Sequence, residues 1–524
     1  VTVFLLHIAF YVSAQQVKDF NLRFSERGTD SWSAMPLGNG EISAQVWTDK
    51  EGKIQMYFGT TDSRDGMDNV IKVGKLTIQF EPNIINSNSD YSETLLLEEG
   101  ILRIKNKLAD IRFRVDANQP EIIISGSAKV PVKIKITNNI WRTETRAFNK
   151  EEYVAEYGDN KMPFKPFMEA DKAIRSAENI IWFHRNKNEV FWNELMKANG
   201  LLDEGIFNPL KNRTSGALVQ GTGLNALNDT VLVAAKAQKN FLIKATVLVK
   251  QTHTEEEYVN ALRQLTTGLD KSKEAKALTA HKKWWQEYWN RSYVYFNSDD
   301  KALNDTLTAL NRGYILQRYV NAIGGRGKLP VKFNGSTLVT DTYNNPIGRV
   351  SGKSADARLW GGAYWWQNTR LIYYPMLASG DFDQLQPFIR FYVDLLPVMK
   401  KMTQKFYRHE GARFIETTHF WGAWRGGDIG WNRTNVEPGL STNPYIKDLI
   451  ICGLEMANFL LDYYAYTGDD KMLQEKTVPF IKEVLLFYDK HYHRDAYGKL
   501  LITPAQSLET SINGVNPTPD IAVL

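Results

Sequence analysis

The chain has 524 residues, of which 43% are hydrophobic and 23% charged, a balance typical of globular domains and not of a disordered chain. Its net charge of +5 is spread without basic runs, so composition argues against a nucleic-acid partner. The single cysteine, Cys452, excludes an intrachain disulfide framework and a cysteine-based metal site. The eight histidines do not cluster, so we expect no metal and no cofactor.

Residues 1–14 are predicted to be the remnant of an export signal. The stretch "VTVFLLHIAFYVSA" is apolar but shorter than the roughly 20 residues that a membrane span needs. Ala14, with Val12 two positions before it, forms a small-residue cleavage site. A starting Met and a basic segment are missing, so a buried N-terminal strand is the alternative. We expect a periplasmic or secreted protein with no membrane span.

Residues 15–252 are rich in short β-type runs. Stretches such as "KLTIQFEP", "IRFRVDA" and "FLIKATVLVK" alternate apolar and polar residues, and Asn-Gly and Glu-Gly turns separate such runs. Many short strands with turn residues between them are typical of a β-sandwich. This part of the chain is therefore predicted to form one large antiparallel β-sandwich.

The hydrophobic period becomes helical after Thr252. Residues 253–298 are predicted to be a helical linker, in which Trp284, Trp285 and Trp289 fall on one helix face. A buried docking stripe between domains is the better interpretation of these tryptophans, and we do not assign them to ligand contacts.

Residues 299–524 alternate helix pairs with long loops. A helix at 303–322 is followed by two predicted hairpins, which are closed by the tight turns "SGDFD" and "TGDD". The hairpin helices are expected at 359–378, 383–406, 443–466 and 471–491. Consecutive antiparallel hairpins place their tight turns at one end and the connecting loops at the other. The three long loops, 323–358, 407–442 and 492–517, should therefore gather on one face.

These loops and the adjoining helix starts hold the least ordinary residues of the chain. Six of the 14 tryptophans lie between positions 360 and 431, beside amides, carboxylates and a histidine. Flat aromatic faces next to such groups suit a sugar, because its C–H faces are apolar and its edges carry hydroxyls. A tryptophan-rich core between helices is the alternative for about half of them. The predicted substrate-binding residues are Asn334, Trp365, Trp366, Gln367, His419, Trp421 and Trp424.

Two glutamates are candidates for acid–base chemistry. Glycoside hydrolysis uses a pair of carboxyl groups that flank the scissile bond. Glu509 lies in "ITPAQSLETSINGVNPTPDI", on a loop of the expected site face, and Glu416 lies in "ETTHFWGAWRGGD". From spacing alone, either carboxylate could instead cap a helix.

Five stretches, in order along the chain, resemble one family. "AMPLGNGEISAQVW", "HKKWWQEYWNRSYV", "RGKLPVKFNG", "AYWWQNTRLIYYPMLASGD" and "ITPAQSLETSINGVNPTPDIA" are similar to segments of the glycoside hydrolase family 95 group of α-L-fucosidases and α-galactosidases. The chain resembles more closely a group of bacterial relatives that bear the domain of unknown function 5703. The resemblance implies an (α/α)6 barrel, of which residues 299–524 would form a part.

The resemblance also implies roles for particular residues. Glu509 would be the general acid, and Asn368 would match the second of two asparagines that position the attacking water. The first of those asparagines falls on Trp366, so the chain departs from the fucosidase pattern there and its sugar stays open. The fucosidases also use an aspartate well beyond the acid, and the sequence ends before that position.

The function predicted from the sequence is an exported glycoside hydrolase of inverting mechanism that acts on glycan side chains or oligosaccharides. Its catalytic residues would be Glu509, Asn368 and Glu416, and its partner would be a carbohydrate substrate. Two alternatives stay open. One is a non-catalytic glycan-binding or degenerate protein, and the other is a polysaccharide lyase with a helical toroid.

Overall fold

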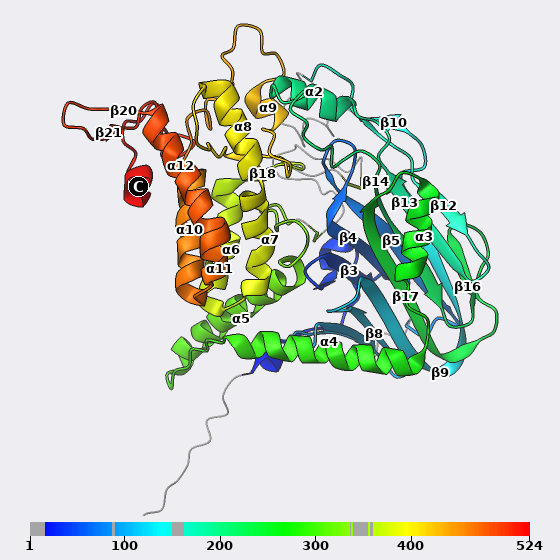
Figure 1. The fold of residues 1–524 in the computed structure, drawn as a ribbon. Helices are drawn as coiled ribbons and strands as arrows, with labels where there is room; N and C mark the ends of the chain where they lie inside the picture. Colours follow the sequence, from blue (N-terminus) through cyan, green and yellow to red (C-terminus); the bar gives the residue numbers. More distant parts are fainter. Residues whose placement is uncertain (1–15, 86–89, 149–161, 336, 339–354, 357–359) are drawn as a thin grey trace, which may run out of the picture.

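The computed structural model in Figure 1 describes residues 16–85, 90–148, 162–335, 337–338, 355–356 and 360–524. Strands fill the N-terminal half, two linking helices follow, and the rest is mainly helical. This order confirms the predicted fold class of a large antiparallel β-domain followed by helices. The predicted signal remnant at 1–14 lies outside the described residues.

The N-terminal half consists of two β layers that share one long strand, β9 (Glu121–Asn138). The first part of β9 pairs with β8 and β17, and its last part pairs with β5 and β16, all antiparallel. One layer contains, in order, β1 (Leu22–Phe24), β6 (Ser92–Leu96), β7 (Ile101–Lys105), β8 (Ala109–Val115), β9, β17 (Gln238–Gln251), β14 (Arg213–Gly221), β13 (Asn179–Arg185) and β12 (Lys172–Arg175). The other contains β2 (Met35–Gly38), β3 (Ile42–Thr48), β4 (Ile54–Arg64), β5 (Val70–Glu81), β9, β16 (Val231–Ala234) and β15 (Leu224–Ala226).

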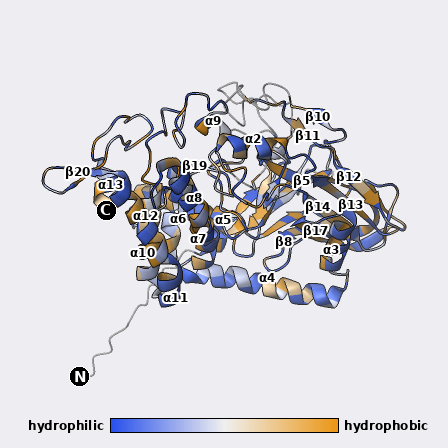
Figure 2. Cartoon of the chain, turned by 45° about the horizontal axis from the view of Figure 1, so that its top comes forward, coloured by the Kyte–Doolittle hydropathy of each residue, from blue (hydrophilic) through white to orange (hydrophobic). Residues whose placement is uncertain are grey.

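Alternation of apolar and polar residues builds the sandwich core. In β8, Ile111 and Phe113 are fully buried, whereas Arg112 between them is exposed. Figure 2 shows hydrophobic residues concentrated along the strands. Strand β3 breaks this rule, since all seven of its residues are buried. Its polar Ser43 donates to the carbonyl of Ile323, 3.2 Å away, so the second face of β3 is covered by the helical half.

The linking helices α3 (Glu255–Leu265) and α4 (Lys271–Arg291) lead to α5 (Lys301–Gly324). Trp285 of α4 is fully buried and stacks on Tyr319 of α5, with ring centroids 5.4 Å apart. The ring N–H of Trp289 donates to the carbonyl of Leu97 on the sandwich, at 3.0 Å. The predicted tryptophan stripe is therefore a docking surface between the two halves.

The helical half continues through pairs that follow the predicted hairpins. Its elements are β18 (Tyr364–Trp365), α6 (Trp366–Ser379), α7 (Phe382–Asp394), α8 (Leu396–Tyr407), β19 (Thr417–Thr418), α9 (Gly426–Ile429), α10 (Cys452–Thr467), α11 (Asp470–Met472), a π-helical turn (Leu473–Thr477), α12 (Val478–His491), β20 (His493–Arg494), β21 (Leu500–Leu501) and α13 (Thr518–Val523). Five further elements belong neither to the two β layers nor to the helical half: the short helices η1 (Val17–Phe20), η2 (Ser31–Ser33) and α2 (Val190–Ala198), and the paired strands β10 (Arg146–Ala147) and β11 (Phe167–Met168).

Three predicted helices were wrong in extent, and the one expected at 359–378 begins only at Trp366. The helix expected at 383–406 is divided between α7 and α8, because Pro397 in the first turn of α8 has no N–H to donate and its ring excludes a continuous helix. The helix expected from 443 begins only at Cys452. The buried side chain of Gln506 donates to the carbonyls of Pro444 and Tyr445, which keeps that stretch in turns.

The predicted gathering of the long loops is confirmed for 407–442 and 492–517, whereas most of the loop 323–358 lies outside the described residues. In Figure 1 the turns that close α6–α7 and α10–α11 lie at one end of the helices, and the segments after α8 and α12 lie at the other. A direct hydrogen bond between Gln367, at the start of α6, and Glu509 joins two of these loop regions. No helix in the described ranges is both long and apolar enough to cross a membrane.

We predict that Gly100→Ala destabilises the docking surface. Gly100 has φ +59°, and a Cβ there would lie 2.2 Å from the Trp285 ring. Gly205→Ala is the matched control, since Gly205 has φ +67° and no atom within 4 Å of the added Cβ. Both variants carry the same backbone strain, but only Gly100→Ala also displaces the tryptophan, at a further cost of about 1–3 kcal/mol. Urea unfolding of both variants measures the difference, and equal losses would contradict the prediction.

Candidate active site

The start of α6 is fixed by a short two-stranded sheet. Strands β18 and β19 pair antiparallel, with Trp365 opposite Thr417. Directly after this pair, the N–H of Trp366 donates to the carbonyl of Glu416, at 2.9 Å. The loop that holds Glu416 is thus attached to the helix that presents Gln367 and Asn368, and α6 begins seven residues later than the predicted 359.

Gln367 links the two glutamates proposed from the sequence. Its backbone N–H donates to Oε1 of Glu416 at 2.9 Å, and its side-chain Nε2 donates to Oε1 of Glu509 at 2.6 Å. The carboxyl groups come from loops more than ninety positions apart and meet at one residue. The structure therefore brings together three of the predicted site residues: Gln367, Glu416 and Glu509.

Glu416 lies in an environment that favours its neutral form. Its side chain is buried, with 1% of the residue exposed, and its second oxygen, Oε2, has no hydrogen-bond partner among the described atoms. Burial raises the pKa of Glu416 to about 8, although the N–H of Gln367 and the charge of Arg370 oppose the rise. Glu416 also caps α6, so the capping interpretation holds for this residue.

A third glutamate completes this group. Oε2 of Glu455, on α10, lies 3.0 Å from Nε of Arg370 on α6, and it also accepts a hydrogen bond from the Trp366 ring N–H. The sequence analysis predicted neither Glu455, which lies in the apolar run "DLIICGLEMANFLL", nor Arg370. The available signal was a charged residue within an otherwise apolar helical run, which requires a buried partner.

The predicted tryptophans are all buried. Trp366 and Trp424 are 0% and 1% exposed. Trp366 stacks on Phe388 with ring centroids 5.6 Å apart, and the N–H of Trp424 donates to Oδ1 of Asn199 in the N-terminal half. The faces of these two rings are covered by protein, and they hold the helices and the loop in place.

Trp365 is buried as well, and packs against a cation and an aromatic ring. It is 8% exposed, with the Arg425 guanidinium 5.3 Å from its ring centroid and the Phe333 ring edge-on at 5.8 Å. Asn334, next to Phe333 in the chain, and Asn368, in the first turn of α6, are both half-buried. Gln367 and Glu509 are half-buried as well.

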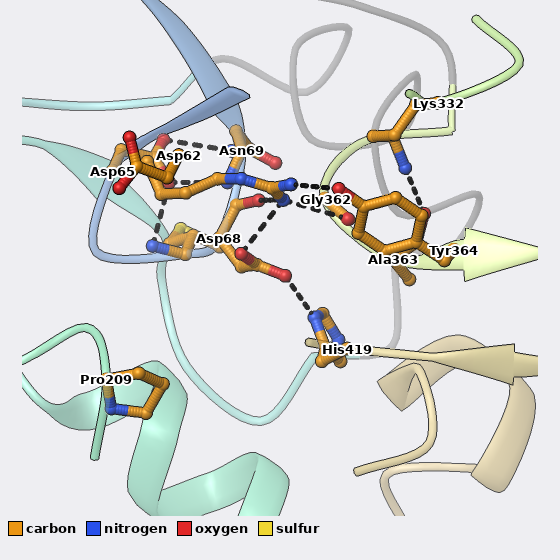
Figure 3. Close-up of polar contacts among 12 residues, drawn as sticks. Asp62, Asp65, Asp68, Asn69, Pro209, Lys332, Gly362, Ala363, Tyr364 and His419 are labelled. Atoms are coloured by element: carbon orange, nitrogen blue, oxygen red, sulfur yellow. Dashed lines mark hydrogen bonds and ion pairs between the residues drawn. The ribbon is translucent and has the colours of Figure 1, made fainter. Parts of the chain in front are cut away.

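His419 and Trp421 lie at the boundary between the two halves. Their rings stack with centroids 4.6 Å apart, and Trp421 also packs against Trp192 of α2. Figure 3 shows the His419 ring directed at Asp68, from the turn between β4 and β5, with 2.5 Å between Nδ1 and Oδ2. Burial lowers the pKa of His419, although Asp68 opposes that shift.

Asp68 is also the ion-pair partner of the fully buried Arg64, with 3.0 Å between Nη1 and Oδ1. Arg64 extends across the boundary, where it donates to the carbonyl of Gly362 at 2.9 Å and to the hydroxyl of Tyr364 at 2.9 Å. Burial would raise the pKa of Asp68, but Arg64 and His419 outweigh it and hold that pKa below its ordinary value. A buried charge network therefore sets the position of β18 and hence of α6.

In the ranges that the structure describes, His, Cys, Asp and Glu side chains form no group that could hold a metal ion. The chemical groups at this site are carboxyls, amides and one arginine. Such a set can donate and accept protons and can hydrogen-bond hydroxyl groups.

Two protein-family models match parts of the chain. A model described as "Domain of unknown function (DUF5703)" matches residues 23–294, more than half of the sequence. The chain belongs to the DUF5703 family. The model of the glycosyl hydrolase family 95 catalytic domain matches residues 353–520, which include Gln367, Glu416, Glu455 and Glu509. No curated protein sequence gives a match.

Solved structures resemble this DUF5703 protein to different extents. A candidate kojibiose phosphorylase from the human microbiome superimposes with a TM-score of 0.55 at 12% identity, over 95% of this chain and 63% of that one. A bacterial glucoamylase complexed with acarbose superimposes with a TM-score of 0.35 at 11% identity, over 88% of this chain and 61% of that one. A family GH92 alpha-mannosidase from Bacteroides thetaiotaomicron, in complex with mannoimidazole, has a TM-score of 0.30 at 8% identity. The match covers 93% of this chain and 66% of that one. The first likeness shows the sandwich and helical-barrel architecture, and the chain spans about 63% of that relative's length.

Glu416→Gln should change how stability depends on pH. The pKa of Glu416 is raised from 4.5 to about 8, so the folded state keeps a proton that the unfolded state releases in that interval. The free energy of unfolding contributed by this group is therefore highest below pH 4.5 and falls as the pH rises towards 8. We expect the melting temperature of Glu416→Gln to exceed that of the wild type increasingly from pH 5 to 9. Glu410, in the same loop, is exposed. The melting temperature of Glu410→Gln should therefore vary with pH in the same way as that of the wild type.

Asp68→Asn should destabilise the boundary strongly. The change leaves Arg64 buried without its charged partner, a loss of about 3–5 kcal/mol. Asp489→Asn removes a carboxylate from an exposed ion pair with Arg494 and should cost at most about 1 kcal/mol. Chemical denaturation compares the two variants, and a loss for Asp68→Asn as small as that of the control would contradict the structural role of the network.

Proposed function

We propose that this DUF5703 protein is a carbohydrate-active enzyme, namely an exported glycoside hydrolase that acts on glycan side chains or oligosaccharides. The observation that carries the proposal is the meeting of Glu416 and Glu509 at Gln367, on the loop face of the helical half. Glycoside hydrolysis requires a carboxyl group that can protonate the glycosidic oxygen, and Glu509 is a carboxyl group that an amide side chain holds in place at this face. Export is proposed from the apolar segment at residues 1–14.

Glu509 is the proposed general acid. It is half-buried and accepts a hydrogen bond from Gln367, which orients its carboxyl group while leaving it accessible to a ligand. In an inverting reaction, Glu509 would protonate the glycosidic oxygen as the bond to the anomeric carbon breaks. A water held by Asn368 would attack that carbon from the opposite face and give its proton to a carboxylate base. Trp365 and Asn334 would contact the sugar.

Glu416 is proposed to act through Gln367. It is too deeply buried to reach a glycosidic oxygen in this structure, but its contact with the Gln367 N–H fixes the residue that orients Glu509. A shift of this glutamine would misplace the acid, and small displacements of a catalytic group cost much of its effect. Direct acid catalysis by Glu416 is the alternative role, and the kinetics below distinguish the two.

The test compares leaving groups. Active substrates are first identified among nitrophenyl glycosides and reduced oligosaccharides, with and without inorganic phosphate, so that hydrolysis is separated from phosphorolysis. Glu509→Gln should then lower kcat/KM by about 10²–10⁴ on an oligosaccharide, whose leaving group needs a proton. The loss on a nitrophenyl glycoside should be much smaller, because nitrophenolate leaves without protonation. Equal losses on both substrates would exclude Glu509 as the acid.

The same comparison assigns Glu416. If it positions Gln367, Glu416→Gln keeps the acceptor for the Gln367 N–H and should change kcat/KM little. Glu416→Ala and Gln367→Ala should then misplace Glu509 and lower kcat/KM more on the oligosaccharide than on the nitrophenyl glycoside. If Glu416 is itself the acid, Glu416→Gln should show a loss that depends on the leaving group. Absence of turnover on every substrate in the wild type would favour the non-catalytic glycan-binding alternative.

A further inference from the structure

A large open cleft lies on the sandwich, away from the candidate active site. Its volume is about 890 Å³, and it is formed by the loop after α2, the end of β17 and helix α3. In Figure 1, α3 and β17 lie on the side of the molecule opposite α10 and α12. No residue that lines this cleft belongs to the helical half, so the cleft is separate from Gln367 and Glu509.

The cleft has an aromatic ring at its edge. Phe207 lines it and is 71% exposed. Such high exposure is unusual for a large apolar side chain. The residues that follow Phe207 fix its backbone: Pro209 is buried, and Oδ1 of Asn208 accepts from the N–H of Leu210 at 2.9 Å. An exposed, well-supported aromatic face offers a surface against which the C–H face of a sugar ring can stack.

Amide side chains supply the polar part of the lining. Asn260 and Gln264 are four positions apart on α3, so they share one helix face, and both are exposed. Each carries a donor and an acceptor, which matches hydroxyl groups that both donate and accept. An aromatic ring opposite a row of amides is the combination that recognises a polyol.

The charges of the cleft balance. Two lysines, Lys211 and Lys250, and two glutamates, Glu189 and Glu257, line it. Lys211 Nζ lies 2.8 Å from Glu189 Oε1, and Glu257 Oε2 accepts from the backbone N–H of His253 at 2.9 Å. Because two lysines and two glutamates line the cleft, their charges cancel and the cleft has no net charge that would select an anionic ligand.

The walls of the cleft are held from inside the sandwich. The buried Arg185 donates to the carbonyls of Thr252 and His253, at 2.7 and 3.1 Å. Gln251 Nε2 donates to the carbonyls of Asn208 and Lys211, at 3.1 and 2.7 Å, which ties the loop after α2 to the end of β17. The lining is therefore pre-organised, which lowers the entropic cost of binding a ligand.

We propose that this cleft is a second carbohydrate-binding site, which binds neutral glycan chains through stacking on Phe207 and hydrogen bonds from Asn260 and Gln264. It would hold a polysaccharide at a point distant from the reacting bond. The site does not depend on catalysis by Glu509, so it can exist whether or not the proposed hydrolase activity is found.

Affinity electrophoresis of the full chain tests the site. Native gels contain one soluble polysaccharide each: xyloglucan, galactomannan, arabinogalactan, mixed-linkage β-glucan, or polygalacturonate as the anionic probe. All samples carry Glu509→Gln so that no polymer is cleaved. We expect at least one neutral polymer to retard the protein, and Phe207→Ala to weaken that binding about tenfold or more, because aromatic anchors dominate such contacts. The double change Asn260→Ala and Gln264→Ala should weaken it too, and alanine preserves the helix.

Leu202→Ala is the matched control, because Leu202 is 46% exposed on the same loop and does not line the cleft. It should bind like the parent. In the chain that keeps Glu509, Phe207→Ala should leave kcat/KM on a small nitrophenyl glycoside unchanged. The proposal is overturned if no neutral polymer retards the protein, if Phe207→Ala is retarded like Leu202→Ala, or if polygalacturonate binds as strongly. If the wild type turns over no substrate but retardation still requires Phe207, the result would support this site and contradict the proposed hydrolase function.

Discussion

The buried guanidinium of Arg64 imposes the constraint on which the rest of the structure depends. An arginine keeps its charge inside a protein, so a fully buried one must have a counter-ion and hydrogen-bond acceptors. Asp68 supplies the charge from the sandwich, whereas the Gly362 carbonyl and the Tyr364 hydroxyl come from the helical half. Moving one half relative to the other would leave this charge unpaired. Because Tyr364 begins β18 and α6 follows directly, the same contact places Gln367.

The parts of the fold that follow local pattern could be predicted from the sequence. Alternating strands, the change of period after Thr252 and the tight turns between helices depend on residues close together in the chain, so the sandwich, the linker and the common loop face were expected. Trp285 and Trp289 were expected to dock two domains and do so. The meeting of Glu416 and Glu509 at one face also follows from hairpin geometry.

What the sequence did not reveal are contacts between residues that lie from 62 to 300 positions apart in the chain. "TTDSRDGMDNV" has the composition of a polar turn, and nothing local indicates that Arg64 is buried against Tyr364. Glu455 was hidden in an apolar run because its partners, Arg370 and Trp366, lie on another helix. The late start of α10 has the same origin, since the carbonyl groups before it are satisfied by Gln506. Tertiary partners, not local propensity, decide each of these cases.

Glu416 combines two opposing demands, and that conflict supports a functional role. Capping the first turn of α6 favours an ionised carboxylate, whereas burial favours the neutral acid and prevails, raising the pKa to about 8. A glutamine at this position could accept the same hydrogen bond from Gln367 without a titration cost. A carboxyl group that reduces stability as the pH rises, beside a second carboxyl on Glu509, is the kind of local conflict that proteins retain at sites where protons are exchanged.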